Sequence, residues 1–239
     1  MLVLFDIDGT LLRTAGAGMN AMLATARELF PAHSFSFDNV AISGRLDRLI
    51  WRDLMANARV ETGGDHHETF RARYGHHLEE AFRSGAQAIP LDGARALVDA
   101  LHQRSHSGVG LLTGNYEHTG RMKVANAGFS LEPFQFNAWA DDGWHRRDLP
   151  PIALARYCAA TERSMSAANT VIIGDTPLDI DCAHFNGCKA IAVATGAHGV
   201  DELQAHAPDL LVKDFSEWES VAQWIADQAS NHASNHASS

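Results

Sequence analysis

Lysine is scarce in this chain, and acidic residues outnumber basic ones. The 239 residues include 19 Lys and Arg against 29 Asp and Glu, which gives a formal net charge of −10. Lysine occurs only at Lys123, Lys189 and Lys213. Binding to the phosphate backbone of a nucleic acid needs a basic face. We therefore expect no nucleic-acid partner.

Cysteines and long apolar runs are also few. Cys158, Cys182 and Cys188 are odd in number and form no C-x-x-C pair, which is typical of reduced thiols in a cytoplasmic protein. No apolar stretch approaches the roughly 20 residues of a membrane span. The short apolar run near the N-terminus has no charged region before it and is soon interrupted by Asp6, unlike a signal peptide. We expect a cytoplasmic protein with no membrane partner, either a monomer or a homodimer.

From about residue 88 onward, strand and helix patterns alternate. Apolar runs predict strands at 108–112, 135–139, 170–174, 189–194 and 209–212. Helical spacing between them predicts helices at 93–104, 118–127, 150–162 and 177–186. Strands separated by helices are typical of an α/β fold with a doubly wound parallel sheet. The buried strand expected at residues 2–5 completes this sheet.

The segment between the first strand and this alternating region has a different pattern. Helices are expected at 16–30, 46–58 and 66–83, and apart from the short stretch 35–42 nothing there is typical of a strand. We interpret residues 1–14 and 88–228 as the catalytic core and residues 15–87 as an inserted helical cap domain. Residues 229–239 repeat a short polar unit with nothing to bury, and we expect a disordered tail.

The most informative motif follows the first strand. An apolar run at residues 2–5 ends in Asp6 and Asp8, and Gly9 follows. In an open α/β sheet, ligands bind at the carboxyl ends of the strands. Two carboxylates at this edge repel each other and lose hydration unless a cation or a reaction uses them. The alternative is a solvated Asp-rich turn that closes a hairpin, which leaves the later motifs unexplained.

Three later motifs fall at the same edge of the predicted sheet. Thr113, Gly114 and Asn115 follow a strand, where a hydroxyl and two backbone amides form an anion nest, although the same residues also make a good helix cap. A basic residue, Arg147 or its neighbour Arg146, precedes the helix that starts near residue 150. Asp175 ends another apolar strand and Asp179 follows one helical turn later. The alternative role for Asp175 is to cap that helix.

In the order and spacing of these motifs, residues 1–213 resemble the haloacid dehalogenase-like (HAD) hydrolase superfamily. The insertion after the first motif resembles the helical cap of subfamily I, which includes phosphoglycolate phosphatases. The resemblance implies that Asp6 is the nucleophile and that Asp8 is the general acid and base. It also implies a Mg²⁺ ion held by Asp6, the backbone carbonyl of Asp8, and Asp175, with Asp179 next to these ligands.

The third motif departs from the family pattern, which usually has lysine in a Lys-Pro-x-Pro frame. With Pro150 at the second proline position, the frame places the role on Arg147, with Arg146 as the alternative and Lys123 as a weaker one. The site needs a fixed cation between the nucleophile and the phosphoryl oxygens. Arginine supplies that charge with bidentate geometry.

The motifs also separate the reactions known in this family. Dehalogenases generally lack the second aspartate, so Asp8 favours phosphoryl chemistry. Phosphonoacetaldehyde hydrolases use a cap lysine, and no lysine lies between residues 11 and 122. We predict a Mg²⁺-dependent phosphatase that hydrolyses a small phosphorylated metabolite through an aspartyl-phosphate. The alternatives are a phosphomutase of the β-phosphoglucomutase kind and a non-catalytic binding protein on the same fold.

The cap contains one candidate for substrate choice. Residues 43–47 resemble the Gly-Arg-x-Asp loop of this subfamily, and Arg45 in this loop is positioned to reach a substrate carboxylate or a second phosphate. The alternative is a solvated arginine that caps the helix after it.

Overall fold

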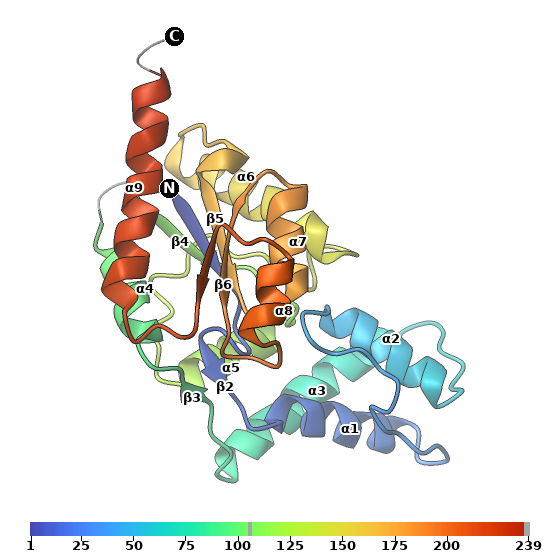
Figure 1. The fold of residues 1–239 in the computed structure, drawn as a ribbon. Helices are drawn as coiled ribbons and strands as arrows, with labels where there is room; N and C mark the ends of the chain where they lie inside the picture. The colour runs from blue at the N-terminus through green and yellow to red at the C-terminus, as the bar shows by residue number, and fades with distance from the viewer. Residues whose placement is uncertain (105–106, 237–239) are drawn as a thin grey trace.

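The computed structural model describes residues 1–104 and 107–236. Its core is a five-stranded parallel sheet in the order β4-β1-β5-β6-β7 (Figure 1). The strands are β1 (Leu2–Phe5), β4 (Gly108–Leu111), β5 (Thr170–Gly174), β6 (Lys189–Val193) and β7 (Leu210–Val212). β1 pairs with β4 on one side and with β5 on the other, so the ends of these three strands lie together. The α/β doubly wound class predicted from the sequence is confirmed.

Alternating side chains of β1 form the cores of both layers. Val3 and Phe5 belong to one hydrophobic cluster, with residues of α4 (Ala94–His102), α5 (Glu117–Asn126) and α9 (Trp218–His236). Leu2 and Leu4 belong to a second cluster, with residues of α6 (Leu149–Thr161), α7 (Pro177–Phe185) and α8 (Val200–Ala205). A strand that is buried on both faces explains the continuous apolar run at residues 2–5.

One predicted strand does not form. At residues 135–139 the chain runs beside β4, with isolated bridges from Phe134 to Val109 and from Ala138 to Leu112. Between these bridges, the side chain of Asn137 accepts the hydrogen bond of the Leu111 amide at 2.8 Å. A side chain thus takes the place of a backbone partner, which interrupts the ladder.

The cap segment contains α1 (Ala17–Leu29), α2 (Asp47–Asn57) and α3 (His66–Arg83), with no strand at 35–42. In Figure 1 these helices lie together beyond the carboxyl edge of the sheet. Two short antiparallel strands, β2 (Leu12–Arg13) and β3 (Ile89–Pro90), join the cap to the core where the chain leaves and returns. Strands of two residues are too short to be predicted from alternation.

The C-terminal helix extends further than the sequence suggests. Disorder was expected from residue 229, but α9 continues to His236, and residues 237–239 lie outside the described residues. Val221 and Ile225 anchor the first half of α9 in the core, and an established helix is extended at little further cost. In the described part of the chain, no helix is long and apolar enough to cross a membrane.

Candidate active site

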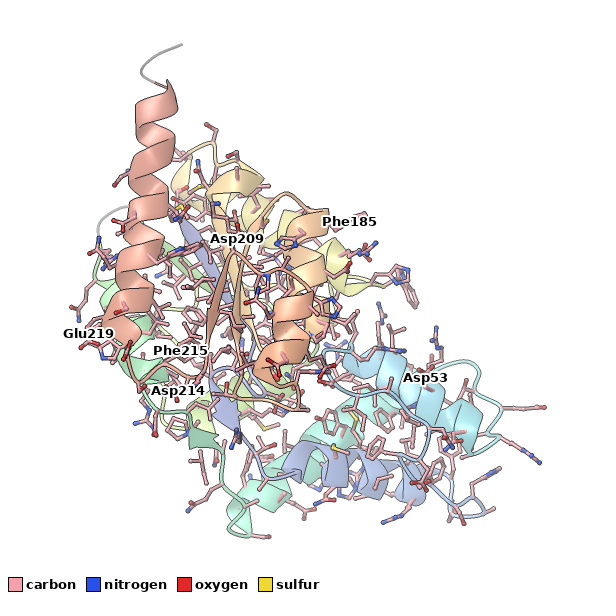
Figure 2. The ribbon with its side chains drawn as sticks, in the orientation of Figure 1. Asp53, Phe185, Asp209, Asp214, Phe215 and Glu219 are labelled. Atoms are coloured by element: carbon pink, nitrogen blue, oxygen red, sulfur yellow. The ribbon has the colours of Figure 1, made fainter. Side chains whose placement is uncertain are left out.

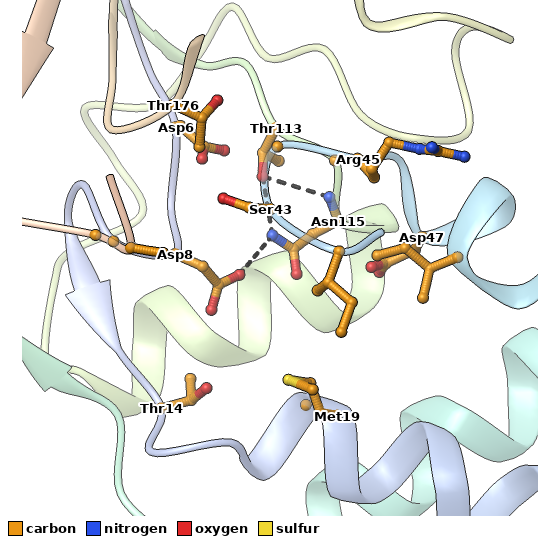
Figure 3. Close-up of a pocket in the computed structure, with 18 of the residues that line it drawn as sticks. Asp6, Asp8, Thr14, Met19, Ser43, Arg45, Asp47, Thr113, Asn115 and Thr176 are labelled. Carbon is orange, nitrogen blue, oxygen red and sulfur yellow. Dashed lines mark hydrogen bonds between the residues drawn. The ribbon is translucent and has the colours of Figure 1, made fainter. Parts of the chain in front are cut away.

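The end of β1 presents two aspartates in different environments. Asp6 is buried, and its amide donates a 2.9 Å hydrogen bond to the carbonyl of Ile173 in β5. Burial raises the pKa of Asp6 to about 6, against the opposing effects of Arg146 and of a hydrogen bond with Thr113. Asp8 is half-buried and projects into the cavity (Figure 3). The sheet therefore fixes the backbone of Asp6, whereas the carboxylate of Asp8 is held by side-chain partners.

The second motif supplies those partners. The side-chain amide of Asn115 donates to Asp8 at 2.9 Å and to the Thr113 hydroxyl at 2.8 Å. Gly114 lies between them in close contact with the cap domain, since a Cβ at this position would come within 2.0 Å of the carbonyl oxygen of Arg45. Only glycine allows the two backbones to approach so closely. The structure thus brings Thr113, Gly114 and Asn115 beside Asp6 and Asp8.

Lys123 is a buried cation that also contacts Asp8. It projects from α5, and its Nζ lies 2.6 Å from Asp8 Oδ2 and 2.6 Å from Asn115 Oδ1. Burial acts to lower the pKa of Lys123, but Asp8 and Asp47 outweigh it, so the net shift is upward. The sequence suggested Lys123 only as a competitor for the third motif. The structure instead places it on the Asp8 side of the site.

Arg146, and not Arg147, occupies the basic position beside Asp6. The Arg146 side chain is only 6% exposed and lies 3.2 Å from Asp6 Oδ1. It also pairs with Asp179 and donates to the carbonyl of Gly44 in the cap at 3.1 Å. Burial acts to lower the pKa of this guanidinium, but Asp179 and Asp6 outweigh burial and raise it. Arg146 is therefore a fixed cation shared between two acidic motifs.

The prediction of Arg147 at this position is wrong. Its side chain is 46% exposed and pairs with Asp181 on α7 at 2.5 Å. It also stacks over Phe185, which lies on the outer side of α7 in Figure 2. Both arginines belong to a short 3₁₀ turn (Arg146–Asp148), in which successive side chains point about 120° apart. Only one of them can face the site, and Pro150 does not determine which.

The fourth motif begins where β5 ends. Asp175 accepts a hydrogen bond from Thr10 at 3.2 Å, and burial and then Asp6 raise its pKa to about 8. Asp179 lies in the first turn of α7, where it accepts hydrogen bonds from the backbone and the hydroxyl of Thr176. With Arg146 on its other oxygen, Asp179 has a partner on each carboxylate oxygen and holds the arginine in place.

These carboxylates fit a divalent cation. Oxygens of Asp6, Asp175 and Asp179 lie within 4.8 Å of one another, and all three residues are buried. The pKa values of Asp6 and Asp175 are raised because each carboxylate is buried close to another negative charge. Gly9 and Gly196 make room for the Asp175 carboxylate, since a Cβ on either would lie within 2.4 Å of its Oδ2. A cation bound between hard oxygen ligands would relieve this repulsion.

The cap domain is closed onto this site. The amide of Asp47 donates to the carbonyl of Gly114 at 2.7 Å, and its carboxylate accepts from the amide of Tyr116 at 3.1 Å. Asp47 is buried, and this burial raises its pKa to about 7. Arg45 lines the cavity but pairs with Asp53 at 2.7 Å, and in Figure 3 its guanidinium points away from Asp6 and Asp8.

Two residues of this site were not assigned a role from the sequence. Asp47 belongs to the loop at 43–47, but it resembles any acidic residue in the first turn of a helix. In the sequence, nothing distinguishes Thr176 from an ordinary helix-capping residue, since it forms a capping box with Asp179. Asp47 acts through contacts with Gly114 and Tyr116, which lie far from it in sequence, so local patterns do not reveal its role.

The chain belongs to the haloacid dehalogenase-like hydrolase family, whose model matches residues 3–184. A pyrophosphatase, PpaX, from Anoxybacillus flavithermus is 26% identical over 225 residues, which cover 92% of this chain and 95% of the relative.

Solved structures show the same fold. β-Phosphoglucomutase from Clostridium difficile has a TM-score of 0.70 at 15% identity, over 95% of this chain and 96% of that one. A predicted phosphoglycolate phosphatase from Haemophilus somnus has a TM-score of 0.66 at 16% identity, over 92% and 96% of the two chains. The family match confirms the resemblance inferred from the sequence, and the solved structures confirm the fold.

Proposed function

We propose that the protein is a Mg²⁺-dependent phosphatase that acts on a small phosphorylated metabolite through an aspartyl-phosphate on Asp6. The observation that carries this proposal is the junction at the ends of β1, β4 and β5. There a buried carboxylate, a second carboxylate with its own partners and a fixed guanidinium all border one cavity. Pyrophosphatase activity in a relative supports phosphoryl chemistry of this kind.

Asp6 acts as the nucleophile, and Asp8 acts as the general acid and then as the general base. An oxygen of Asp6 attacks phosphorus, the bond from phosphorus to the leaving oxygen breaks, and Asp8 gives its proton to that oxygen. Lys123, 2.6 Å from Asp8, stabilises the carboxylate that Asp8 becomes after this transfer. Asp8 then removes a proton from the water that attacks the aspartyl-phosphate, which releases phosphate and restores Asp6.

The groups around Asp6 stabilise the transferred phosphoryl group. Thr113 and the backbone beside it, with Arg146, supply donors in a fixed arrangement, where they act most strongly on developing charge. Asp6, Asp175 and the backbone carbonyl of Asp8 are the groups that would hold Mg²⁺. When bound, this ion would screen the repulsion between the Asp6 carboxylate and the phosphate and orient the phosphoryl group.

The test is the release of inorganic phosphate from a panel of phosphomonoesters, with and without Mg²⁺. We expect turnover that needs Mg²⁺ and is lost in Asp6→Asn. To test the mutase alternative, phosphorus NMR of the same reactions with glucose 1-phosphate would detect an isomerised sugar phosphate in place of free phosphate. Isomer formation without net phosphate release, or turnover that persists in Asp6→Asn, would contradict the proposal.

A further inference from the structure

The cavity beside Asp6 has one polar and one apolar wall. Its volume is about 560 Å³, much more than a phosphoryl group fills. The core supplies the polar wall described above. The cap wall is formed mainly by apolar side chains of α1, the following loop, α2 and α3, namely Met19, Met22, Phe37, Ile42, Ile50 and Tyr74.

Of the four cations among the described residues that line this cavity, three are paired with carboxylates. Arg146 and Lys123 pair with the acidic residues of the core, and Arg45 pairs with Asp53. Arg13 is exposed and lies on β2, where it donates to the backbone carbonyl of Thr195. Among the described residues that line the cavity, no cation points from the cap toward the leaving group.

We propose that the alcohol released from the substrate is neutral and mainly apolar, and that it packs against Met19, Met22 and Ile42. This inference rests on the proposed phosphatase function and specifies its substrate class. A carboxylate or second phosphate against this wall would lose its hydration without gaining a counter-charge, whereas an alkyl or aryl group gains from burial.

The test compares two esters that differ only in charge, n-hexyl phosphate and its analogue ending in a carboxylate, with phosphoglycolate and pyrophosphate as smaller anionic substrates. We expect kcat/KM for n-hexyl phosphate to exceed that of each anionic substrate at least tenfold. Met19 is 38% exposed and points into the cavity in Figure 3, so Met19→Lys should fold and should shift the ratio at least tenfold toward the carboxylate ester. Ile89→Lys adds the same charge at a 58% exposed position outside the cavity and should leave the ratio unchanged.

Binding of the corresponding non-hydrolysable phosphonates, measured by calorimetry, separates this inference from the proposed function. Tighter binding of the hexyl phosphonate, with no hydrolysis of any ester, would support the apolar wall and contradict the phosphatase function. Preference for the carboxylate-ended compound in both assays would overturn the inference. If Arg45→Gln or Arg13→Gln then removed that preference, the mutated arginine would be the anion-binding residue.

Discussion

The core edge and the cap wall face each other across one cavity, and they are built in opposite ways. On the core edge, Asp6, Asp8 and Asp179 each contact a buried basic side chain, Arg146 or Lys123. On the cap wall, the side chains are mainly apolar, and Arg45 pairs with Asp53 and points away from Asp6 and Asp8. The proposed function assigns chemistry to the core edge and substrate choice to the cap wall, so we expect a mutation in one to leave the role of the other largely intact.

Loss of the nucleophile should have the largest effect. Asp6→Asn keeps the size of the side chain but cannot form the aspartyl-phosphate, so we expect phosphate release to fall by about 10⁴-fold or more. Steady-state phosphate release measures this loss, and circular dichroism checks that the variant is folded. Turnover within tenfold of the wild type would exclude Asp6 as the nucleophile.

Replacement of Arg146, whose guanidinium contacts both Asp6 and Asp179, should have the second largest effect on turnover. Arg146→Ala leaves Asp6 and Asp179 buried without a counter-charge. We expect turnover to fall by about 10²- to 10³-fold and the free energy of unfolding to fall by about 3–5 kcal/mol.

Arg147→Ala is the matched control for this variant, because it removes the same side chain one residue away at an exposed position. Its turnover and urea midpoint should stay near those of the wild type. If the two variants exchanged these properties, the placement of the third motif in the structure would be wrong.

Arg146 and Arg147 also show which features of the site cannot be predicted from the sequence. The ends of β1, β4 and β5 are predictable because an apolar run that stops at Asp6, Thr113 or Asp175 fixes both the strand and its polar edge. Which of Arg146 and Arg147 faces the site depends on how the chain enters a short 3₁₀ turn. The hydrophobic periodicity of the sequence does not predict this orientation. The pairing of Lys123 with Asp8, and of Arg45 with Asp53, depends on how helices pack against other segments.

Lys123 offers a third way to test the core edge. Lys123→Met removes the cation beside Asp8. Without this cation, the Asp8 carboxyl group is no longer held in position and its anionic form is less stable. We expect kcat/KM, which reports transfer of the phosphoryl group to Asp6 and not the later hydrolysis step, to fall by about 10- to 100-fold for alkyl phosphates. The loss should be much smaller for p-nitrophenyl phosphate, because its leaving group needs little help from a proton. An equal loss for both substrates would indicate that Lys123 has only a structural role.

The stability of the metal-free protein should depend on pH through the same carboxylates. Asp6, Asp47 and Asp175 have pKa values raised to about 6, 7 and 8 from a usual 3.8, so the folded state favours their protonated forms. Their contribution to stability is complete below about pH 4 and is lost as the pH rises through these values. We therefore expect the Tm measured in EDTA to fall between pH 5 and pH 8.

Added Mg²⁺ should reverse this loss. At one hundred times its Kd, a ligand adds about 2.7 kcal/mol, which corresponds to roughly 5–10 °C in Tm for a chain of this size. The rise should be larger at pH 8 than at pH 5, and Asp175→Asn should abolish it. A Mg²⁺ response that survives in Asp175→Asn would place the ion elsewhere.

Mutation of Asp47, which connects the cap to the core, should have the smallest effect on activity and stability. Asp47 joins the cap to the core by accepting the hydrogen bond of the Tyr116 amide, and burial raises its pKa to about 7, so that its neutral form is well populated near neutral pH. Asp47→Asn keeps an acceptor of the same shape, so turnover and stability at pH 7 should match the wild type. Asp47→Ala leaves the Tyr116 amide buried without a partner, which costs about 1–3 kcal/mol. Part of that cost should fall on closure of the cap, seen as a rise of a few-fold in KM with kcat nearly unchanged. If Asp47→Asn raised KM as much as Asp47→Ala, the charge of Asp47 rather than its hydrogen bond would hold the cap against the core.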